Sequence, residues 1–506
     1  MLAAIPSATL LGVEGHHVTV EVHVSAGLPG FSIVGLPDEG CREARDRVRA
    51  AVLSSGLTWP TKRITVNLAP ASQRKGGAGL DLAIAIGVLV ANDELTSQSV
   101  ENFGFIGELG LDGSLRPVHG AAPLVVALGA VHVVVAVGNR AEAEAFSSRP
   151  VRVARCLRDV YEALKGDARW PCIAADTASA EPEEVADISD VRGQTLAKQA
   201  LEIAAAGGHH TLFLGPPGSG KTMLAQRLCG LLPLLNPQES LQATMVHSAA
   251  GARLPASGLL TRPPFRAPHH TCSIVSLIGG GTSALRPGEI SLAHGGVLFL
   301  DELGEFSASV LDGMRQPLEE GVVRVARARA SATLPARFLL VAATNPCPCG
   351  GGAPGACDCD DGSRARYLRR LSGPLMDRFD MRVPVQRPQV DEMLQPSDAE
   401  STAVVAERVL TARLKSIARN GGLNASIAAP LLDTFAPLTA AAQRMLRREL
   451  ETDRLTGRGY HRIRRVARTI ADLDSRNDNE LVGDGHVAVA LQLRVRLSPL
   501  QRGRAA

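Results

Sequence analysis

Residues 211–222 read TLFLGPPGSGKT, an apolar run followed by a glycine-rich loop that ends in Lys221 and Thr222. The loop matches the pattern GxxxxGK[ST], and the next residues, MLAQRLCGLL, have the composition of an apolar helix. A strand, a glycine-rich turn and a helix in this order direct backbone N–H groups and the positive end of the helix dipole toward phosphates. The stretch therefore predicts an α/β domain with a parallel sheet that binds a nucleoside triphosphate.

Each residue type in the loop has an expected task. Lys221 would reach the β- and γ-phosphates of ATP, and the hydroxyl of Thr222 would ligate Mg²⁺. The predicted nucleotide-binding residues are those of the whole loop: Gly215, Pro216, Pro217, Gly218, Ser219, Gly220, Lys221 and Thr222. The alternative, a glycine-rich turn that carries Lys-Thr by chance, fits the flanking strand and helix poorly.

Two later apolar runs supply polar residues to the same edge of the predicted sheet. VLFLDE ends in Asp301 and Glu302, and FLLVAATN ends in Asn345. Asp301 is expected to hold magnesium, and Glu302 to orient and polarise the attacking water. Asn345 is expected beside that water, although an Asn before Pro346 also commonly starts a turn. A solvated strand end is the alternative for the two carboxylates.

Length and composition indicate the number of domains, the class of protein and its location. The chain has 506 residues, which suggests about three domains. Its 45% hydrophobic and 21% charged residues are typical of globular proteins, and a net charge of +3 neither requires nor excludes a polyanionic partner. Nine cysteines without a signal sequence predict a reducing, cytoplasmic location. The most apolar run, residues 121–137, is broken by proline and glycine and is shorter than the about 20 residues of a membrane span, so no membrane is expected.

The chain divides into regions of different pattern. Residues 1–165 alternate β-branched runs with helical stretches, as in an α/β or α+β domain. Residues 166–186 are rich in Ala, Asp, Glu, Ser and Pro and predict a linker. Residues 187–395 hold the nucleotide motifs, and residues 396–506 predict a helical, arginine-rich domain.

Several longer stretches resemble the magnesium-chelatase-like AAA+ ATPases of the ComM/YifB family. They are FRAPHHT (265–271), RPGEISLAHGGVLFLDELGEF (286–306), ATNPCPCG (343–350) and RYLRRLSGPLMDRFD (366–380). The resemblance covers almost the whole chain. It implies an AAA+ core with a helical C-terminal lid, and a homohexameric, DNA-dependent ATPase that uses ATP and Mg²⁺. Such a motor or helicase moves branched DNA junctions in homologous recombination and natural transformation. The alternative is an ATPase that remodels a protein or cofactor complex, as magnesium chelatase does.

The resemblance also assigns roles to arginines. Arg378 matches the arginine finger that enters the neighbouring subunit's ATP site, whereas the residues alone predict only surface ion pairs around Asp377. Arg458 is placed as the sensor-2 arginine, with Arg464 and Arg465 as competitors. The segment 320–337 matches a β-hairpin that faces the central channel. Its predicted DNA contacts are Arg324, Arg327 and Arg329, with a solvated basic face as the alternative.

The N-terminal region resembles the Lon-type protease fold, a ribosomal S5 domain 2-like fold, in residues 67–87 and 105–121. The family's serine position falls at Gly77-Ala78 and its lysine position at Ala121-Ala122, so no protease activity is expected. Ser72 beside Lys75 is a superficial substitute for the dyad, and a polar loop is the better interpretation.

Two further patterns leave alternatives open. Cys347, Cys349, Cys357 and Cys359 form a C-x-C, seven-residue, C-x-C pattern, which predicts either a zinc site or a reduced surface loop. Between residues 444 and 468 a helical stretch is dense in arginine. These arginines predict either a DNA-facing helix or a lid whose arginines pair with nearby Glu and Asp.

Overall fold

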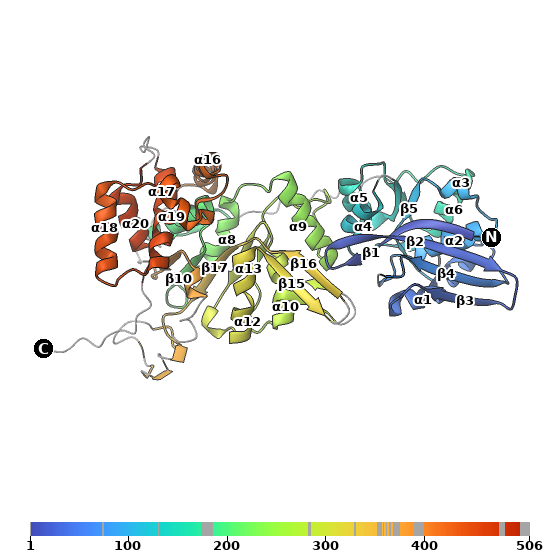
Figure 1. The fold of residues 1–506 in the computed structure, drawn as a ribbon, viewed down its shortest axis with the longest axis horizontal. Helices are drawn as coiled ribbons and strands as arrows, with labels where there is room; N and C mark the ends of the chain where they lie inside the picture. The colour runs from blue at the N-terminus through green and yellow to red at the C-terminus, as the bar shows by residue number, and fades with distance from the viewer. Residues whose placement is uncertain are drawn as a thin grey trace.

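The computed structural model describes most of the chain. The described residues are 2–72, 75–129, 131–173, 186–281, 285–327, 330–351, 357, 359–360, 362–363, 366–367, 375–388, 392, 399–474 and 481–495. An N-terminal domain, a core domain and a C-terminal helical domain follow one another along the longest axis of the molecule (Figure 1). The predicted linker, residues 166–186, lies largely outside the described residues.

The N-terminal domain is built on a four-stranded sheet of order β1-β2-β4-β3. Its strands are β1 Leu2–Leu11, β2 Glu14–Ser25, β3 Gly30–Val34 and β4 Arg63–Ala69. Helices α1 (Glu39–Ser54) and α2 (Asp81–Ala91) pack against each other, and every residue of α2 is buried. The strands expected within the first 70 residues are confirmed, except that β1 was not foreseen. Pro6 lies within β1, which the sheet tolerates because β1 is an edge strand.

A smaller parallel sheet completes this domain. It contains β5 Phe103–Phe105, β8 His132–Ala136 and β9 Arg152–Ala154, in that order. The helices of this part are α3 Ser97–Val100, α4 Ala121–Leu128, α5 Arg140–Phe146 and α6 Leu157–Lys165, and a short β6–β7 ladder joins Glu108–Leu109 to Leu115–Arg116. The apolar run 121–137 is therefore a helix followed by a buried strand, as predicted.

The core domain holds a five-stranded sheet of order β11-β14-β17-β10-β18, and all neighbouring pairs are parallel. Its strands are β10 Thr211–Leu214, β11 Phe265–Arg266, β14 Val297–Leu300, β17 Leu339–Thr344 and β18 Met381–Pro384. Helices α7 (Thr195–Gly207), α8 (Lys221–Leu231) and α9 (Pro237–Ala250) connect or cover them. β14 and β17 are buried along their whole length, as apolar strands of a covered parallel sheet should be. The parallel sheet predicted from the sequence is confirmed.

Two insertions leave this core. The first contains α10 (Ile274–Ile278), a β12–β13 ladder between Gly279–Gly280 and Arg286–Pro287, and α11 (Glu289–Leu292). After β14 come α12 (Ala308–Gly313) and α13 (Arg315–Glu320), and then the second insertion, an antiparallel hairpin of β15 (Val322–Arg327) and β16 (Ala330–Pro335). The hairpin expected at 320–337 is thus confirmed.

The base of this hairpin packs on the N-terminal domain. Val323 and Leu334 share one hydrophobic cluster with Val13, which lies in the turn between β1 and β2. The contact is close, because a Cβ added at Gly12 would come within 2.8 Å of the Cβ of Ala332. A second contact joins the domains where the N–H of Gly120 donates to the carbonyl of Ser248 over 3.0 Å. The two domains therefore share a packed interface.

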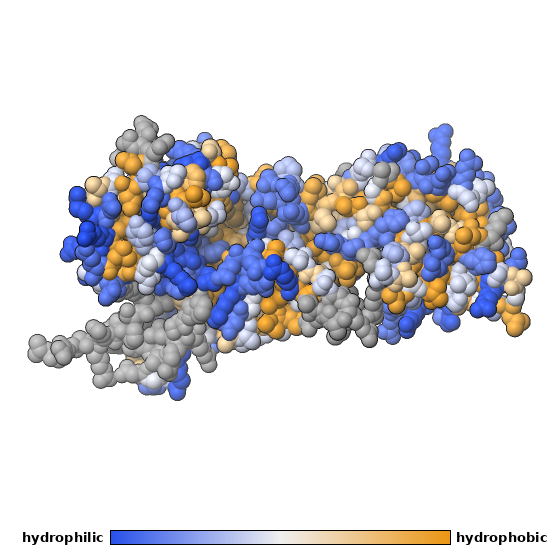
Figure 2. Space-filling view, viewed as in Figure 1, coloured by the Kyte–Doolittle hydropathy of each residue, from blue (hydrophilic) through white to orange (hydrophobic). Residues whose placement is uncertain are grey.

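The C-terminal domain is helical in its described residues, as predicted. It contains α16 Thr402–Asn420, α17 Leu432–Phe435, α18 Ala440–Glu451, α19 Gly457–Leu473 and α20 Asp484–Gln492. Strongly hydrophilic side chains are spread over this domain and the adjoining part of the core (Figure 2). Several arginines of the stretch 444–468 pair with acids of the domain itself, such as Arg447 with Glu451 and Arg468 with Asp472. These pairs favour the lid interpretation for those arginines.

None of the helices in the described part of the chain combines the length and the apolar character that crossing a bilayer requires.

Candidate nucleotide site

The glycine-rich loop leaves the carboxyl end of β10 and turns directly into α8. Gly218 and Gly220 have φ of +72° and +86°, a region that favours glycine, and Gly220 is the N-cap residue of α8. This geometry turns the loop's backbone N–H groups and the helix N-terminus toward one space. The loop therefore has the shape of an anion cradle.

Lys221 lies inside this loop and is largely buried. Its Nζ donates to the carbonyls of Gly215 and Pro216, over 2.8 Å each, and to Oδ1 of Asn345 over 3.2 Å. Burial lowers the pKa of Lys221 from its ordinary value, while Asp301 and Glu302 act in the opposite direction. Phosphate oxygens can replace the carbonyls as partners of the ammonium, because they accept the same hydrogen bonds and also carry charge.

The predicted magnesium residues lie next to each other. Oγ1 of Thr222 donates to Oδ2 of Asp301 over 2.7 Å, and Oδ1 of Asp301 accepts the N–H of Glu302 over 2.9 Å. A hydroxyl and a carboxylate at this spacing are the hard oxygen donors that Mg²⁺ prefers in combination with phosphate oxygens and water. The residues present therefore fit a magnesium ion.

Glu302 is held in an unusual backbone conformation, with φ and ψ both near +50°. Its carboxylate is exposed and lies 3.3 Å from Nδ1 of His270. His270 also contacts the ring of Phe306 edge-on, with 6.4 Å between ring centroids. The side chain of the predicted base thus contacts a residue of the FRAPHHT stretch, between β11 and α10, to which the sequence assigned no role.

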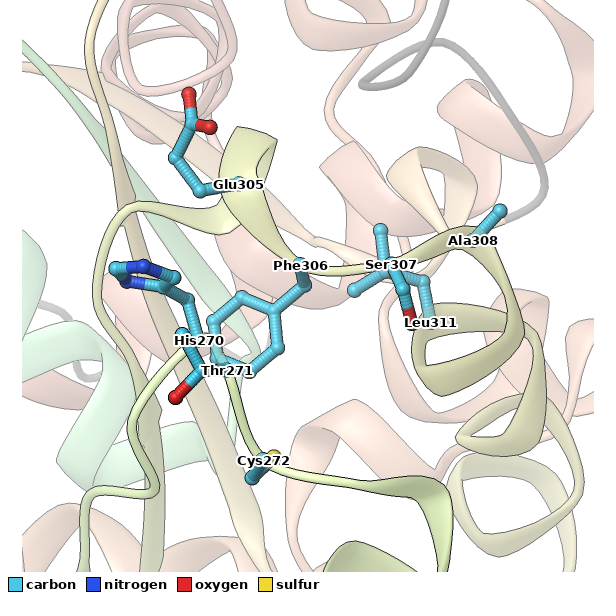
Figure 3. A pocket seen from close by; sticks show the side chains of 8 residues that line it. All are labelled: His270, Thr271, Cys272, Glu305, Phe306, Ser307, Ala308 and Leu311. Carbon is cyan, nitrogen blue, oxygen red and sulfur yellow. The ribbon is translucent and has the colours of Figure 1, made fainter.

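A cavity of about 590 Å³ opens on this side of the core (Figure 3). It is lined by His270, Thr271, Cys272, Glu305, Phe306, Ser307, Ala308 and Leu311. His270 borders the cavity and also contacts Glu302, so the segment between β11 and α10 meets the carboxyl edge of the sheet at this imidazole.

Two residues touch the loop without having been predicted to do so. Gln194, at φ +57°, donates from Nε2 to the carbonyl of Ser219 over 3.2 Å and also to the carbonyl of Gln386. Arg387 donates to the carbonyl of Pro217 over 3.3 Å. Gln194 ends the run DVRGQ (190–194), to which the sequence assigned no role. A tertiary contact of this kind leaves no local pattern in the sequence.

Arg378 lies at the opposite edge of the sheet from the loop. It ends a short 3₁₀ turn (Met376–Arg378) just before β18, and Met381, the first residue of β18, pairs with Thr211, the first residue of β10. The loop follows the other end of β10, which is four residues long. At about 3.3 Å per residue, roughly 10–13 Å of strand separates the two edges. Arg378 therefore lies at the edge of the sheet opposite to the phosphate loop of its own chain.

Other cations surround Arg378. Its carbonyl accepts a hydrogen bond from Arg462 over 3.0 Å, and Arg458 lies 3.5 Å from the carboxylate of the adjacent Asp377. Burial and the cations Arg462, Arg458 and Arg315 lower the pKa of Arg378 from its ordinary value, and its guanidinium donates to Glu319. Several arginines therefore lie close together at the end of the sheet where the strands begin, which we call the amino edge.

The sensor-2 candidates differ in what they touch. Arg464 is 5% exposed and donates to Asp433 and to the carbonyls of Leu432 and Ala436. Arg465 donates to the carbonyl of Ile427 over 2.8 Å. Arg458 is 75% exposed, at the start of α19. Of these candidates, Arg458 is the one whose guanidinium can reach a partner outside its own domain.

The structure also locates the cysteines and the hairpin arginines. The Sγ atoms of Cys347, Cys349, Cys357 and Cys359 all lie within 4.8 Å of one another. Arg324 is 58% exposed and pairs with Glu320. The side chain of Arg327 and the whole of Arg329 lie outside the described residues.

A parallel sheet with a phosphate loop, a carboxylate hydrogen-bonded to the loop's threonine and an arginine at its opposite edge, joined to a helical domain, is typical of AAA+ ATPases. Comparison with known families agrees. Residues 187–393 match the model described as magnesium chelatase, subunit ChlI; residues 20–139 match subunit ChlI of Mg-chelatase; and residues 399–494 match the ChlI C-terminal model.

Similar proteins cover nearly the whole chain. The competence protein ComM of Haemophilus influenzae is 42% identical over 508 residues, which is 99% of each chain. The uncharacterized protein YifB of Escherichia coli is 41% identical over 503 residues, 97% of each chain. An uncharacterized protein of Mycobacterium tuberculosis is 44% identical over 495 residues, 96% of this chain and 97% of its own. The chain belongs to the ComM/YifB family of magnesium-chelatase-like AAA+ ATPases, which implies that it uses ATP and Mg²⁺.

Proposed function

We propose that this protein is an ATP-hydrolysing motor that works as a ring of identical subunits, a hexamer as in the family, and moves branched DNA. The observation that supports the ring is the position of Arg378 at the amino edge of the sheet, away from its own phosphate loop. A finger in that position acts on ATP only when a second copy presents its loop to it. The nucleotide site is then complete only between two subunits.

Within that site the chain's residues divide the work. Lys221 exchanges the carbonyls of Gly215 and Pro216 for phosphate oxygens, and Thr222 and Asp301 hold Mg²⁺. The metal, when bound, neutralises charge on the phosphates. Glu302 orients the attacking water and accepts its proton, and Asn345 keeps Lys221 in place. Arg378 and Arg458 of the adjacent copy stabilise the charge that develops on the transferred phosphoryl group.

DNA is the proposed substrate for two reasons. The relative from Haemophilus influenzae is named a competence protein, and competence concerns the uptake and use of DNA. The hairpin β15–β16 also carries an exposed arginine, Arg324. We propose that Arg324, Arg327 and Arg329 contact the phosphate backbone.

The second candidate is a remodelling ATPase for a protein or cofactor complex. It is supported by the magnesium-chelatase 67 kDa subunit of Chlorobaculum parvum, which is 29% identical over 164 residues, 31% of this chain. That match leaves more than two thirds of the chain unmatched. A chain-long similarity to ComM favours the DNA motor.

For the N-terminal domain we propose a Lon-like fold that has lost peptidase chemistry. Ser72 is exposed on the surface, whereas Lys75 is fully buried and donates from Nζ to the carbonyl of Pro70. Burial lowers the pKa of Lys75 from its ordinary value. A lysine committed to a backbone carbonyl is a poor base for an exposed serine, because the pair needs direct hydrogen-bond contact.

The test measures ATP hydrolysis by the full-length protein without DNA, with linear duplex and with a four-way junction. We expect the junction to stimulate most and the fluorescently labelled junction to be converted to products. Replacement of Arg324 by Ala should weaken DNA binding on all sequences and lower the salt slope by about 0.9 per lost phosphate contact.

Arg447→Ala is the matched control, since Arg447 is equally part of an exposed (i,i+4) ion pair but lies on α18. ATP hydrolysis that no DNA stimulates, in a ring verified by mass photometry, would favour the remodelling alternative. An Arg324→Ala variant with an unchanged salt slope would place the DNA path away from the hairpin.

A further inference from the structure

Next to the nucleotide site, but not part of it, four cysteine sulfurs converge. Sγ of Cys347 lies 3.4 Å from that of Cys349 and 3.5 Å from that of Cys357, and Cys349 and Cys357 are 3.5 Å apart. With Cys359 included, all of these Sγ atoms lie within 4.8 Å of one another. The thiols come from two separate C-x-C pairs, so the chain has to fold back on itself to bring them together.

The spacing fits a single metal ion. In a tetrahedral site with metal–sulfur distances of about 2.3 Å, neighbouring sulfurs are about 3.8 Å apart. The observed distances are close to this value, and the 4.8 Å limit leaves no room for a cluster of several metals between the sulfurs. Four sulfur donors in a tetrahedral set favour zinc over the hard cation of the nucleotide site.

The first cysteine pair is tied to the phosphate loop on both sides. Asn345, two residues before Cys347, accepts a hydrogen bond from Lys221 over 3.2 Å. Gly350, directly after Cys349, lies against Pro217 at φ +79°, and a Cβ there would be 2.5 Å from Cδ of Pro217. The N–H of Gly350 donates to the carbonyl of Cys347 over 3.0 Å, which closes the turn. The cysteine turn and the phosphate loop therefore pack as one unit.

We propose that these cysteines bind one structural zinc ion, and that the zinc-held turn braces the phosphate loop so that zinc and ATP bind cooperatively. The ion takes no part in hydrolysis. It fixes the turn through its thiolates, and the turn positions Asn345 and Gly350 against Lys221 and Pro217. The inference rests on the proposed nucleotide site but is independent of DNA.

The metal is tested by elemental analysis of the full-length protein purified under reducing conditions without chelator. We expect about one zinc per chain, lost in the double variant Cys349→Ser/Cys359→Ser, whose positions are not fully buried. The double variant Cys156→Ser/Cys172→Ser, which changes two cysteines of the N-terminal region, should keep its zinc. A metal-free folded protein, a disulfide within the cluster, or iron in place of zinc would overturn the assignment.

The bracing is tested by the affinity for a fluorescent ATP analogue, with excess Mg²⁺, before and after zinc is removed by a zinc-selective chelator. We expect affinity to fall roughly five-fold or more, and ATP to protect zinc from the chelator by the same factor, because coupling between two sites is reciprocal. Circular dichroism verifies that the stripped protein remains folded. Unchanged nucleotide affinity in folded, zinc-free protein would overturn the bracing.

A variant that leaves the thiols intact tests the bracing of the phosphate loop separately from zinc binding. Gly350→Ala should keep zinc and weaken ATP binding, since its new Cβ meets Pro217. Gly421→Ala is the control, because Gly421 also has a positive φ, +70°, but faces open space at the end of α16. If Lys221→Ala abolishes nucleotide binding while zinc removal and Gly350→Ala leave it unchanged, the proposed site stands and the bracing fails. If Lys221→Ala itself binds ATP normally, the proposed site fails.

Discussion

The two edges of the core sheet are built in different ways. At the carboxyl edge, Thr222 donates to Asp301 over 2.7 Å and Lys221 donates to Asn345 over 3.2 Å, all within one chain. Arg378 lies at the amino edge, and Arg458, at the start of α19, lies 3.5 Å from the carboxylate of the adjacent Asp377. One edge therefore gathers the residues that would meet a nucleotide, whereas at the other Arg378 is 18% exposed and donates to Glu319. In the proposed ring, each chain therefore contributes its phosphate loop to one ATP site and Arg378 to the neighbouring one.

The largest effects are expected from two substitutions at the carboxyl edge, one that removes ATP binding and one that removes hydrolysis. Lys221→Ala should abolish nucleotide binding, because it removes the cation that clamps the phosphates. Glu302→Gln should bind ATP normally but hydrolyse it about 10²–10⁴-fold more slowly, because a general base acts on the transition state. Binding is measured by filter retention and turnover by phosphate release.

Glu305→Gln, on the 3₁₀ turn that follows Glu302, is the matched control and should keep normal turnover. Wild-type hydrolysis by Glu302→Gln would show that another group activates the water.

Removing the proposed arginine finger should slow ATP hydrolysis by a comparable factor, and mixing with a second variant should partly reverse this loss. Arg378→Ala should bind ATP and hydrolyse it about 10³-fold more slowly, since an arginine finger supplies this much elsewhere. Mixing inactive Arg378→Ala with inactive Lys221→Ala subunits should restore part of the activity, because some interfaces then join an intact loop to an intact finger. Hydrolysis is followed across a range of mixing ratios.

Arg315→Ala removes a nearby arginine that forms a surface pair with Asp312, and it should change little. Mixed rings, verified by native mass spectrometry, that stay inactive would contradict a site shared between the two edges.

The smallest expected effect concerns pH and belongs to the amino edge. His210 and His294 both lie near the start of strands, and each accepts a backbone N–H at Nδ1, from Leu340 and Arg337 respectively, over 3.0 Å. Burial lowers the pKa of each imidazole from 6.5 to about 4. The unfolded chain therefore takes up protons first, so stability is complete above pH 6.5 and falls as the pH drops from 6.5 toward 4.

We expect the free energy of unfolding, measured in urea, to fall by about 1 kcal/mol per pH unit for His294 within that window. His294→Gln should flatten this slope, and His23→Gln, at an exposed position of β2, should leave it unchanged. A slope that His294→Gln does not alter would remove the buried imidazole as its cause.

The contrast between the edges also explains what the sequence could predict. Asp301 and Asn345 directly follow apolar strands and Thr222 ends the glycine-rich loop motif, so local patterns locate all three. The choice among Arg458, Arg464 and Arg465 could not be made from the sequence, because it depends on carbonyls of Leu432, Ala436 and Ile427 that the fold brings to two of them.

Other structural features could not be predicted from the sequence, because they too depend on contacts between distant segments. The strand β1 contains Pro6 and small residues, and the sheet tolerates Pro6 because β1 lies at its edge. The contact of His270 with Glu302 joins two segments about 30 residues apart through a turn with no periodic pattern. The cysteine spacing predicted a cluster, whereas the packing of Gly350 on Pro217 required the structure.

The packing of the β1–β2 turn against the β15–β16 hairpin has a practical consequence for producing fragments of the protein. A cut in the segment 166–186, the obvious boundary by composition, would free a motor fragment that still carries Val323, Val325 and Leu334 but has lost Val13 and its neighbours. Apolar side chains stripped of their cover favour self-association. A soluble fragment for biochemistry therefore needs either the hairpin shortened along with the N-terminal domain, or the turn supplied back as a separate peptide.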